Sequence, residues 1–245
     1  MSAPLVRPTV GMVLAAGRGE RLRPLTDTMP KPLVPVIGKP LLDHAIERLT
    51  AAGVARIVVN AHYLGDQIVG HLWGRTNPEI VISREETVLE TGGGVTHALP
   101  LLGDQPFYAV NGDSLWLDGS VPALDRLAAA FDPARHDALL LLQRTVSAVG
   151  YEQNRGDFFL EADERPRRVG PGEIAPYLFA GVQILSPSLF ADAPAGAFSL
   201  NRIYDKALAE GRLGAIVHDG EWYTVTDEAG LAEVRAQLDR RRIRR

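Results

Sequence analysis

The chain has 245 residues, 46% of them hydrophobic, and a formal net charge of −4, which is ordinary for a globular protein with a sizeable core. It contains no cysteine, which excludes disulfides, thiolate zinc sites and cysteine nucleophiles, and its negative charge argues against a nucleic-acid partner. No apolar stretch is as long as a membrane span and the N-terminus lacks a signal-peptide core, so we expect no membrane partner and a cytoplasmic location.

Apolar strands alternate with amphipathic segments along the chain. Residues 9–16 (TVGMVLAA) predict a buried strand, and apolar residues at helical spacing in 41–49 predict a helix that ends before Gly53. Further helices are expected at 63–73, 95–102, 121–131, 202–210 and 228–240, and further strands at 56–61, 79–83, 107–110, 138–143, 157–161 and 178–185 and near Ala215 and Tyr223. The alternation predicts an α/β fold, a Rossmann-like three-layer αβα sandwich around a mostly parallel mixed sheet. Because no linker-like stretch separates two cores, we expect a single domain over 1–245.

A glycine-containing loop follows the first predicted strand. Gly17 and Gly19 allow a tight turn that brings backbone N–H groups close to an anion, and Arg21 and Lys31 add positive charge. The spacing excludes a P-loop, because Lys31 lies far beyond the glycines. It also excludes a dinucleotide fingerprint, because Leu22 stands where the third glycine belongs. The loop therefore predicts a phosphate site of another kind.

Two other segments lie where ligands bind in open α/β sheets, outside the carboxyl ends of the strands. Asp113 follows the strand at 107–110 and Gly112, so its carboxylate can project into a cleft and bind magnesium beside phosphates. A turn-capping role is the alternative. The segment LETGGG at 89–94 contains three successive glycines, whose entropic cost is explained if the chain closely approaches a flat base, with a flexible turn as the alternative.

The string GRGERLRPLT at 17–26, followed by PKPLVPV at 30–36, resembles the signature of the sugar-nucleotide pyrophosphorylases. These nucleotidyltransferases join a nucleoside triphosphate to a sugar 1-phosphate. The resemblance implies a GT-A-like nucleotidyltransferase fold, with a nucleotide-binding part at about 1–118 and a sugar-binding part at about 119–245. It also implies that Mg²⁺ is the cofactor, with Asp113 as its ligand, and that Arg21 and Lys31 handle the phosphates.

Further matches run along nearly the whole chain and narrow the resemblance. They are Gly19-Glu20-Arg21, LETGGG, LPLLGDQPF before Asn111-Gly112-Asp113, Gly156-Asp157-Phe158, and AGAFSL at 195–200. They are similar to those of the short uridylyltransferases that act on N-acetylmuramic acid 1-phosphate in peptidoglycan recycling, which implies UTP and that sugar phosphate as substrates. Relatives that use mannose 1-phosphate or glucose 1-phosphate share the opening motif, so these substrates remain an alternative.

The expected site residues fall into three sets. The catalytic set is Arg21, Lys31 and Asp113. The nucleoside is expected to lie against Ala15, Ala16, Gly17, Gly19, Thr91, Gly92 and Gly93, with Glu85 as the acceptor for the uracil N3–H. Contacts to the sugar hydroxyl or acyl groups are expected from Asn111 and Asp157.

The sequence departs from the family pattern in two places. The resemblance implies a second metal-binding aspartate in a W-x-D-V-G-T-like strand end, but WYTVTD at 222–227 has Thr224 there. A threonine hydroxyl is a poor substitute for a carboxylate, so a catalytically weakened nucleotide-sugar binding homologue is a second alternative. Asp227 can take the place of the missing aspartate only if the chain bends differently there. Glu164-Arg165-Pro166 is similar to a sugar-phosphate E-K-P element, but its polar surroundings predict a hairpin turn.

Overall fold

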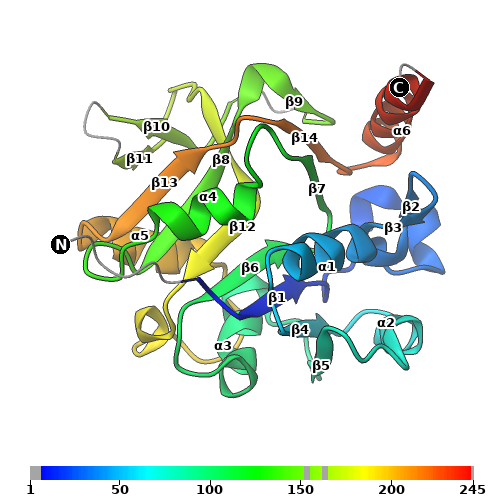
Figure 1. The fold of residues 1–245 in the computed structure, drawn as a ribbon, viewed down its shortest axis with the longest axis horizontal. Coiled ribbons are helices and arrows are strands. Elements are labelled where there is room, and N and C mark those ends of the chain that lie inside the picture. The colour runs from blue at the N-terminus through cyan, green and yellow to red at the C-terminus, as the bar shows by residue number, and fades with distance from the viewer. Residues whose placement is uncertain (1–6, 152–154, 162–164, 244–245) are drawn as a thin grey trace.

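The computed structural model describes residues 7–151, 155–161 and 165–243 (Figure 1). The strands are β1 (Val10–Leu14), β2 (Pro35–Val36), β3 (Lys39–Pro40), β4 (Arg56–Ala61), β5 (Glu79–Arg84), β6 (Phe107–Asn111), β7 (Ser114–Leu117), β8 (Ala138–Arg144), β9 (Ala148–Val149), β10 (Phe158–Leu160), β11 (Pro166–Arg168), β12 (Tyr177–Leu185), β13 (Leu213–Val217) and β14 (Glu221–Thr224). The helices are α1 (Leu41–Ala51), α2 (Gly65–Leu72), α3 (Glu90–Leu102), α4 (Ala123–Ala130), α5 (Asn201–Ala209) and α6 (Glu228–Ile243). Short 3₁₀ helices lie at Glu20–Leu22, Leu25–Asp27, Lys31–Leu33, Thr145–Ser147 and Pro187–Phe190.

A nine-stranded mixed sheet forms the centre of the fold. β1 lies between β4 and β6, and β5 lies on the other side of β4, with all four strands parallel. β12 runs antiparallel to β6 and to β8, and β8 is parallel to β13. Because β1, β4, β5 and β6 are parallel, their carboxyl ends meet at one edge, which is where open α/β sheets bind ligands.

Helices cover both faces of the sheet (Figure 1). On one face α1, α2 and α4 supply buried residues such as Leu42 and Leu127, which belong to the same core as Val13 of β1. On the other face α3 and α5 supply Ala98 and Ile203, which share a core with Met12. Adjacent residues of β1 enter opposite cores because successive side chains of a strand alternate between faces. The predicted three-layer α/β sandwich is confirmed.

A smaller sheet of β7, β14 and β9 lies beside the main one and carries α6. Leu231 and Val234 of α6 are buried in one cluster with Tyr223 of β14 and with Leu22 and Val34. Leu22 and Val34 belong to the segment that follows β1. The last helix therefore packs against the loop that the sequence singles out, and holds it in place.

The hairpin predicted around residues 164–166 is present. β10 and β11 pair antiparallel, with Leu160 opposite Pro166, and the Glu161 amide donates to the Arg165 carbonyl at 2.9 Å. Glu164 itself lies outside the described residues. The sequence pattern did not predict β2, β3, β7, β9 or β11, each of four residues or fewer, because strands this short carry too few residues for a period to show.

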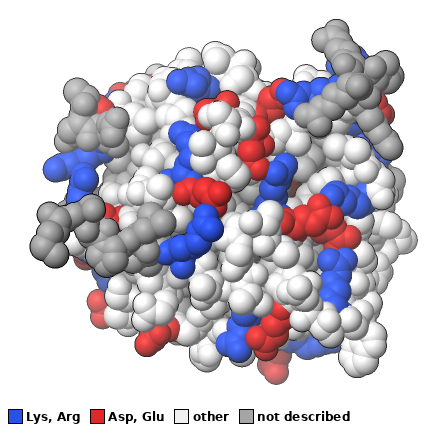
Figure 2. All heavy atoms as spheres, viewed as in Figure 1, with Lys and Arg blue, Asp and Glu red and all other residues white. Residues whose placement is uncertain are grey.

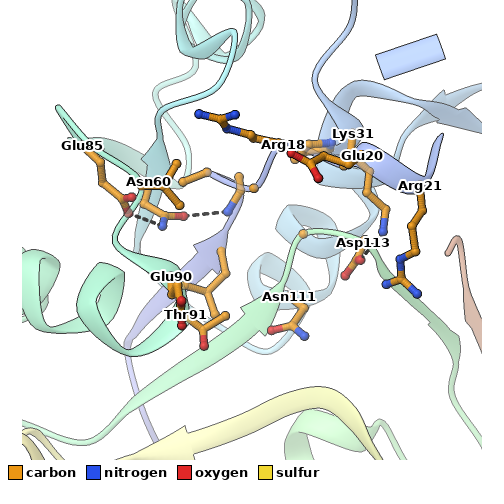
Figure 3. Close-up of a pocket in the computed structure, with 18 of the residues that line it drawn as sticks. Arg18, Glu20, Arg21, Lys31, Asn60, Glu85, Glu90, Thr91, Asn111 and Asp113 are labelled. Atoms are coloured by element: carbon orange, nitrogen blue, oxygen red, sulfur yellow. Dashed lines mark hydrogen bonds and ion pairs between the residues drawn. The ribbon is translucent and has the colours of Figure 1, made fainter. Parts of the chain in front are cut away.

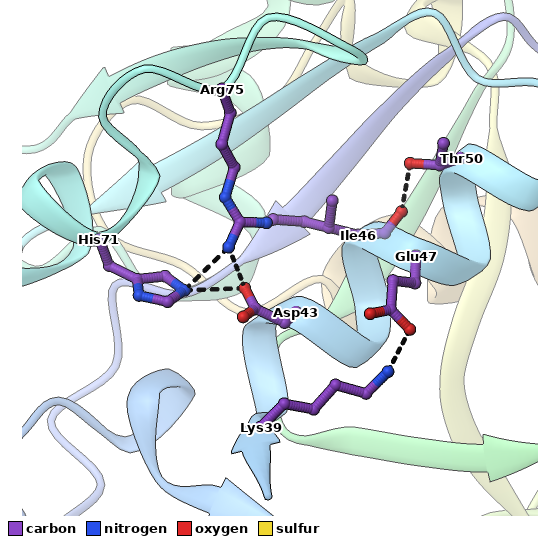
Figure 4. A network of polar contacts seen from close by, with 7 residues as sticks. All are labelled: Lys39, Asp43, Ile46, Glu47, Thr50, His71 and Arg75. Atoms are coloured by element: carbon purple, nitrogen blue, oxygen red, sulfur yellow. Dashed lines mark hydrogen bonds and ion pairs between the residues drawn. The ribbon is translucent and has the colours of Figure 1, made fainter.

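Polar contacts tie α2 to α1 (Figure 4). Asp43 of α1 accepts a hydrogen bond from Arg75 Nη2 at 2.7 Å and lies 2.8 Å from His71 Nε2. In the same view Lys39 pairs with Glu47 at the surface.

Basic and acidic side chains are interspersed over the face drawn in Figure 2. Among the described residues, no helix combines the length and apolarity that crossing a membrane requires.

Gly150 is a position at which we expect the smaller sheet to be sensitive to substitution. Its φ is +76°, and a Cβ there would lie 2.2 Å from the Thr224 carbonyl oxygen, whereas Gly172 has the same φ with open space around it. Both alanine substitutions incur the cost of a left-handed backbone, about 1–2 kcal/mol. We expect Gly150→Ala to cost about 1–3 kcal/mol more because it overpacks β14. Chemical denaturation of the two variants measures this difference, and equal losses would contradict the packing argument.

Candidate active site

Two adjoining cavities open at the carboxyl-end edge of the main sheet. The first, of about 550 Å³, is lined by residues from the ends of β1, β4 and β6 (Figure 3). The second, of about 300 Å³, is lined by residues of β7, β12 and β14. Arg21, Asn111, Asp113 and Thr226 line both. Groups bound in the two cavities would therefore meet at these four residues.

The glycine loop wraps over the stem of Lys31. Gly19 has a φ of +63°, and a Cβ there would lie 2.9 Å from Lys31 Cβ. The Gly19 carbonyl accepts hydrogen bonds from Thr26 Oγ1 and the Leu22 amide, both at 2.9 Å. Gly17 has no heavy atom within 4 Å of its Cβ position and lines the first cavity. Gly19 is thus required by the fold, while Gly17 leaves room for a ligand.

Lys31 and Asp113 form an ion pair at one end of the first cavity (Figure 3). Lys31 Nζ donates to Asp113 Oδ2 at 2.5 Å, and the Lys31 side chain is only 13% exposed. Asp113 reaches this position because the Gly112 amide donates a hydrogen bond to the Leu14 carbonyl oxygen. Only glycine allows this approach, since a Cβ on residue 112 would lie 2.8 Å from the same oxygen. Arg21 lies on the same side of the cavity. Two cations and one carboxylate therefore converge, as the sequence predicts.

A different polar group lies at the opposite end of this cavity (Figure 3). Asn60, buried at the end of β4, accepts the Ala15 amide N–H at 2.6 Å and donates to Glu85 Oε1 at 2.6 Å. Glu85 is 6% exposed, and its Oε2 accepts a longer bond of 3.3 Å from the Leu89 amide. The cavity thus has a cationic end and an end lined by a carboxylate.

Most of the predicted site residues gather around the first cavity. Its lining includes Ala15, Ala16, Gly17, Gly19, Arg21, Lys31, Glu85, Thr91, Asn111 and Asp113. Asp157 lines the second cavity, where its Oδ2 accepts the Phe179 amide N–H at 2.8 Å. The predicted catalytic set thus shares one cavity, and the predicted sugar contacts Asn111 and Asp157 both reach the adjoining one.

Gly92 and Gly93 lie apart from the other predicted site residues. The helix expected at 95–102 begins earlier, at Glu90, so that both glycines lie in its first turn. Their amides donate to the Phe198 carbonyl at 2.8 and 3.1 Å, and neither residue lines the first cavity. A Cβ on Gly92 would lie 2.3 Å from the Phe198 ring. The close approach that these glycines permit in the structure is to another segment of the protein, and their contact with a base stays a prediction.

The second cavity is also lined by Thr224 and Asp227, the residues at which the sequence differs from the family pattern. Thr224 pairs with Ser114 across β14 and β7, and Asp227 lies just beyond the strand; all three line the cavity together with Asp113. Asp227 Oδ1 caps α6 by accepting the Gly230 amide at 2.8 Å. Tyr151 lines the same cavity, and burial raises the pKa of its hydroxyl, opposed by the hydrogen bond from the Gly156 amide. The bend after β14 thus brings Asp227 to the cavity.

Several lining residues were not predicted. Asn60 is the most important, and its signal in the sequence is a lone amide inside the apolar run RIVVNA. Glu90, with a φ of +57°, and Arg18 also line the first cavity. Neither stands out in the sequence, because exposed charges are common in loops and at helix starts.

Comparison with known proteins decides the family. A sequence model described as nucleotidyl transferase matches residues 10–151. The chain belongs to the nucleotidyl transferase family. It is 44% identical to the N-acetylmuramate alpha-1-phosphate uridylyltransferase of Caulobacter vibrioides, over 94% of this chain and 97% of that protein. It is 39% identical to the enzyme of the same name from Neisseria meningitidis serogroup B, over 92% and 96%.

Solved structures support the same fold. A UDP-glucose pyrophosphorylase complexed with UDP-glucose superposes with a TM-score of 0.78 at 17% identity, covering 96% of this chain and 99% of that one. HddC from Yersinia pseudotuberculosis, complexed with GMP-PN, gives 0.74 at 22% identity, covering 94% and 99%. The GT-A-like nucleotidyltransferase fold implied by the sequence is confirmed.

The packing role of Gly92 can be tested by stability. We expect Gly92→Ala to lower the free energy of unfolding by about 1–3 kcal/mol, because the methyl group overpacks the Phe198 ring. Gly70, in α2 with no heavy atom within 4 Å of its Cβ position, is the control, since alanine there should stabilise by about 0.8–1 kcal/mol. Thermal unfolding compares them. A Gly92→Ala protein of full stability that had only lost nucleotide affinity would restore the base-contact interpretation.

Proposed function

We propose that this protein is a cytoplasmic uridylyltransferase that joins UTP to N-acetylmuramic acid 1-phosphate and releases pyrophosphate, in the recycling of peptidoglycan. The observation that carries the proposal is the convergence of Arg21, Lys31 and Asp113 at the point where the two cavities meet. The two uridylyltransferases that resemble the chain over nearly its whole length supply the choice of substrates. No nucleic acid or membrane is required by this reaction.

The chemistry is an in-line phosphoryl-group substitution. A phosphate oxygen of the sugar 1-phosphate attacks the α-phosphorus of the triphosphate, a new P–O bond forms, and the bond to the bridging oxygen breaks as pyrophosphate leaves with the electron pair. Two highly charged groups must approach each other, so catalysis consists of positioning and electrostatic stabilisation. Lys31 contacts the phosphates that meet, and Arg21, at the wall between the cavities, contacts the triphosphate and the leaving group.

The donor set at this point fits a magnesium ion. Magnesium prefers one or two carboxylates together with phosphate and water oxygens. Asp113 and Asp227 line one cavity, and each has one oxygen engaged, by Lys31 Nζ and by the Gly230 amide respectively. Asp113 would hold the ion, with Asp227 or the Thr224 hydroxyl close by. When bound, Mg²⁺ neutralises phosphate charge in the transferring group.

The nucleoside lies at the other end of the first cavity. Backbone groups of Ala15, Ala16 and Gly17 and the side chain of Thr91 line this region. Glu85, which lines this cavity, would accept the uracil N3–H, because a carboxylate oxygen is a hydrogen-bond acceptor. The sugar phosphate occupies the second cavity, where Asn111 and Asp157 contact its hydroxyl or acyl groups.

One observation favours a second candidate function. Thr224 occupies the strand end at which the family pattern has a metal-binding aspartate, and one oxygen of Asp227 is engaged in the α6 cap. A site with a weakened metal position would suit a nucleotide-sugar binding protein. Such a protein binds a uridine nucleotide but releases no pyrophosphate. A pyrophosphate-release assay with UTP, GTP, CTP and dTTP against N-acetylmuramic acid, mannose and glucose 1-phosphates separates these candidates and the alternative sugars.

Lys31→Ala should lower kcat/KM for pyrophosphate release by about a hundredfold or more, because it removes charge stabilisation at the transferring phosphate. Lys39→Ala is the control, since Lys39 forms an exposed ion pair with Glu47 and should leave kcat/KM within twofold, roughly. Both variants should retain wild-type circular dichroism. Near-normal turnover of Lys31→Ala would remove Lys31 from the catalytic set.

Chelation should abolish turnover, and added Mg²⁺ should restore it in the wild type. In Asp113→Asn the Mg²⁺ concentration for half-maximal activity should rise by about tenfold or more, because the neutral amide is a weaker ligand for a hard cation. Asp66→Asn, at a carboxylate that is 91% exposed, should titrate like the wild type. Full activity in excess EDTA would rule out the metal requirement.

A further inference from the structure

A chain of hydrogen bonds links three strand ends at the base end of the first cavity. The Ala15 amide at the end of β1 donates to Asn60 Oδ1, and Asn60 Nδ2 donates to Glu85 Oε1, both at 2.6 Å. Asn60 is 2% exposed, so its polar atoms have no access to solvent as an alternative. Gly94 leaves room for the pair, since a Cβ there would lie 2.8 Å from Glu85 Oε1 and 2.9 Å from Asn60 Nδ2.

The orientation of the Asn60 amide is fixed by the backbone. The Ala15 N–H can only donate, so the atom of Asn60 that faces it must be the oxygen. The amide nitrogen of Asn60 then has to face Glu85, and it can only donate in turn. Whatever residue 85 is, the atom that it turns towards Asn60 must therefore be an acceptor.

We propose that Asn60 is a positioning residue that sets which hydrogen-bonding group residue 85 presents to the base, and that this polarity selects a base with an N–H at that edge. The inference rests on the proposed function, in which Glu85 contacts the base. With glutamate at 85, the second oxygen is also an acceptor, and it already receives the long bond from the Leu89 amide. Uracil presents N3–H at this edge, whereas cytosine presents a lone pair at N3, which the carboxylate repels.

Substitutions at positions 60 and 85 should change which base binds. In Glu85→Gln, Oε1 must accept from Asn60, so Nε2 would point towards the base as a donor and the long bond from the Leu89 amide would be lost for both nucleotides alike. This variant should bind cytosine better than uracil. In Asn60→Asp, two carboxylates would face each other and both nucleotides should bind poorly.

The double variant Asn60→Asp with Glu85→Gln should reverse the chain. One oxygen of the new carboxylate at position 60 still accepts the Ala15 N–H, and the other accepts from the glutamine Nε2. The glutamine Oε1 then faces the base and the Leu89 amide. An acceptor towards the base is restored, and with it the preference for uracil. A purely structural role for Asn60 predicts no such return of base preference.

Calorimetric affinities for UTP and CTP in the presence of Mg²⁺ test the inference. We expect the ratio of UTP to CTP affinity to fall by about tenfold to a hundredfold in Glu85→Gln, since each mismatch leaves buried polar groups unpaired. It should recover by at least about tenfold in the double variant. Ser83→Ala is the matched control. Ser83 lies opposite Asn60 on β5, and its buried hydroxyl has no hydrogen-bond partner among the described residues, so the ratio should not change.

Nucleotide affinities, measured apart from turnover, test the Asn60 inference separately from the uridylyltransferase proposal. If the wild type binds UTP over CTP but releases no pyrophosphate, the uridylyltransferase proposal fails while the Asn60 inference stands on the affinity ratios. A ratio unchanged in Glu85→Gln, or unrecovered in a folded double variant, overturns the inference. So does a wild type that binds neither nucleotide or that prefers CTP.

Discussion

The parallel pairing of β1 with β6 is the constraint on which the site depends. Leu14 pairs with Asn111, and the Gly112 amide bonds to the Leu14 carbonyl. The chain therefore leaves β6 directly against the loop that leaves β1, and Asp113 meets Lys31 at 2.5 Å. With Lys31 largely buried, neither partner can lose the other without a substitute charge. On the proposed function, a polyphosphate that arrives with a cation supplies both substitutes at once.

The second half of the chain completes the site through the same sheet. β12 pairs with β6 on one side and with β8 on the other, and its register with β8 shifts between Phe179 and Gln183. Gly181 at this shift has a φ of +74°, and a Cβ there would lie 2.2 Å from Ser114 Oγ and 3.0 Å from Asn111 Nδ2. The glycine thus lets β12 pass close to the end of β6, and Gly181 lines the second cavity beside the first. Two substrates held there are neighbours, which is where an in-line transfer gains most from positioning. The division of the chain at about residue 118 stays a prediction, because both parts contribute to one sheet.

The sequence predicted those parts of the site that local patterns encode. The glycine loop, Lys31 and Asp113 all follow buried strands, and the edge at which parallel strands end brings them together. The packing of Gly92 and Gly93 was not predicted because their partner, the Phe198 carbonyl, lies far along the chain. Asn60 was missed because the role of a buried amide depends on its hydrogen-bond partners. Here these are the Ala15 amide and Glu85, and the periodicity of the sequence does not predict either contact. Asp227 reaches the cavity through the bend after β14, which no local pattern in the sequence predicts.

The distribution of charge within the cavity matters more than the net charge of the chain. Arg21 and Lys31 lie at one end, and Glu85 lies at the other (Figure 3). A nucleotide bound in reverse would place its phosphates against a buried carboxylate, and would leave two cations without the phosphate charge that they otherwise meet. Both penalties arise where water is largely displaced, so they are screened less than at the surface. On the proposed function, the same few residues would therefore set the direction in which a nucleotide binds.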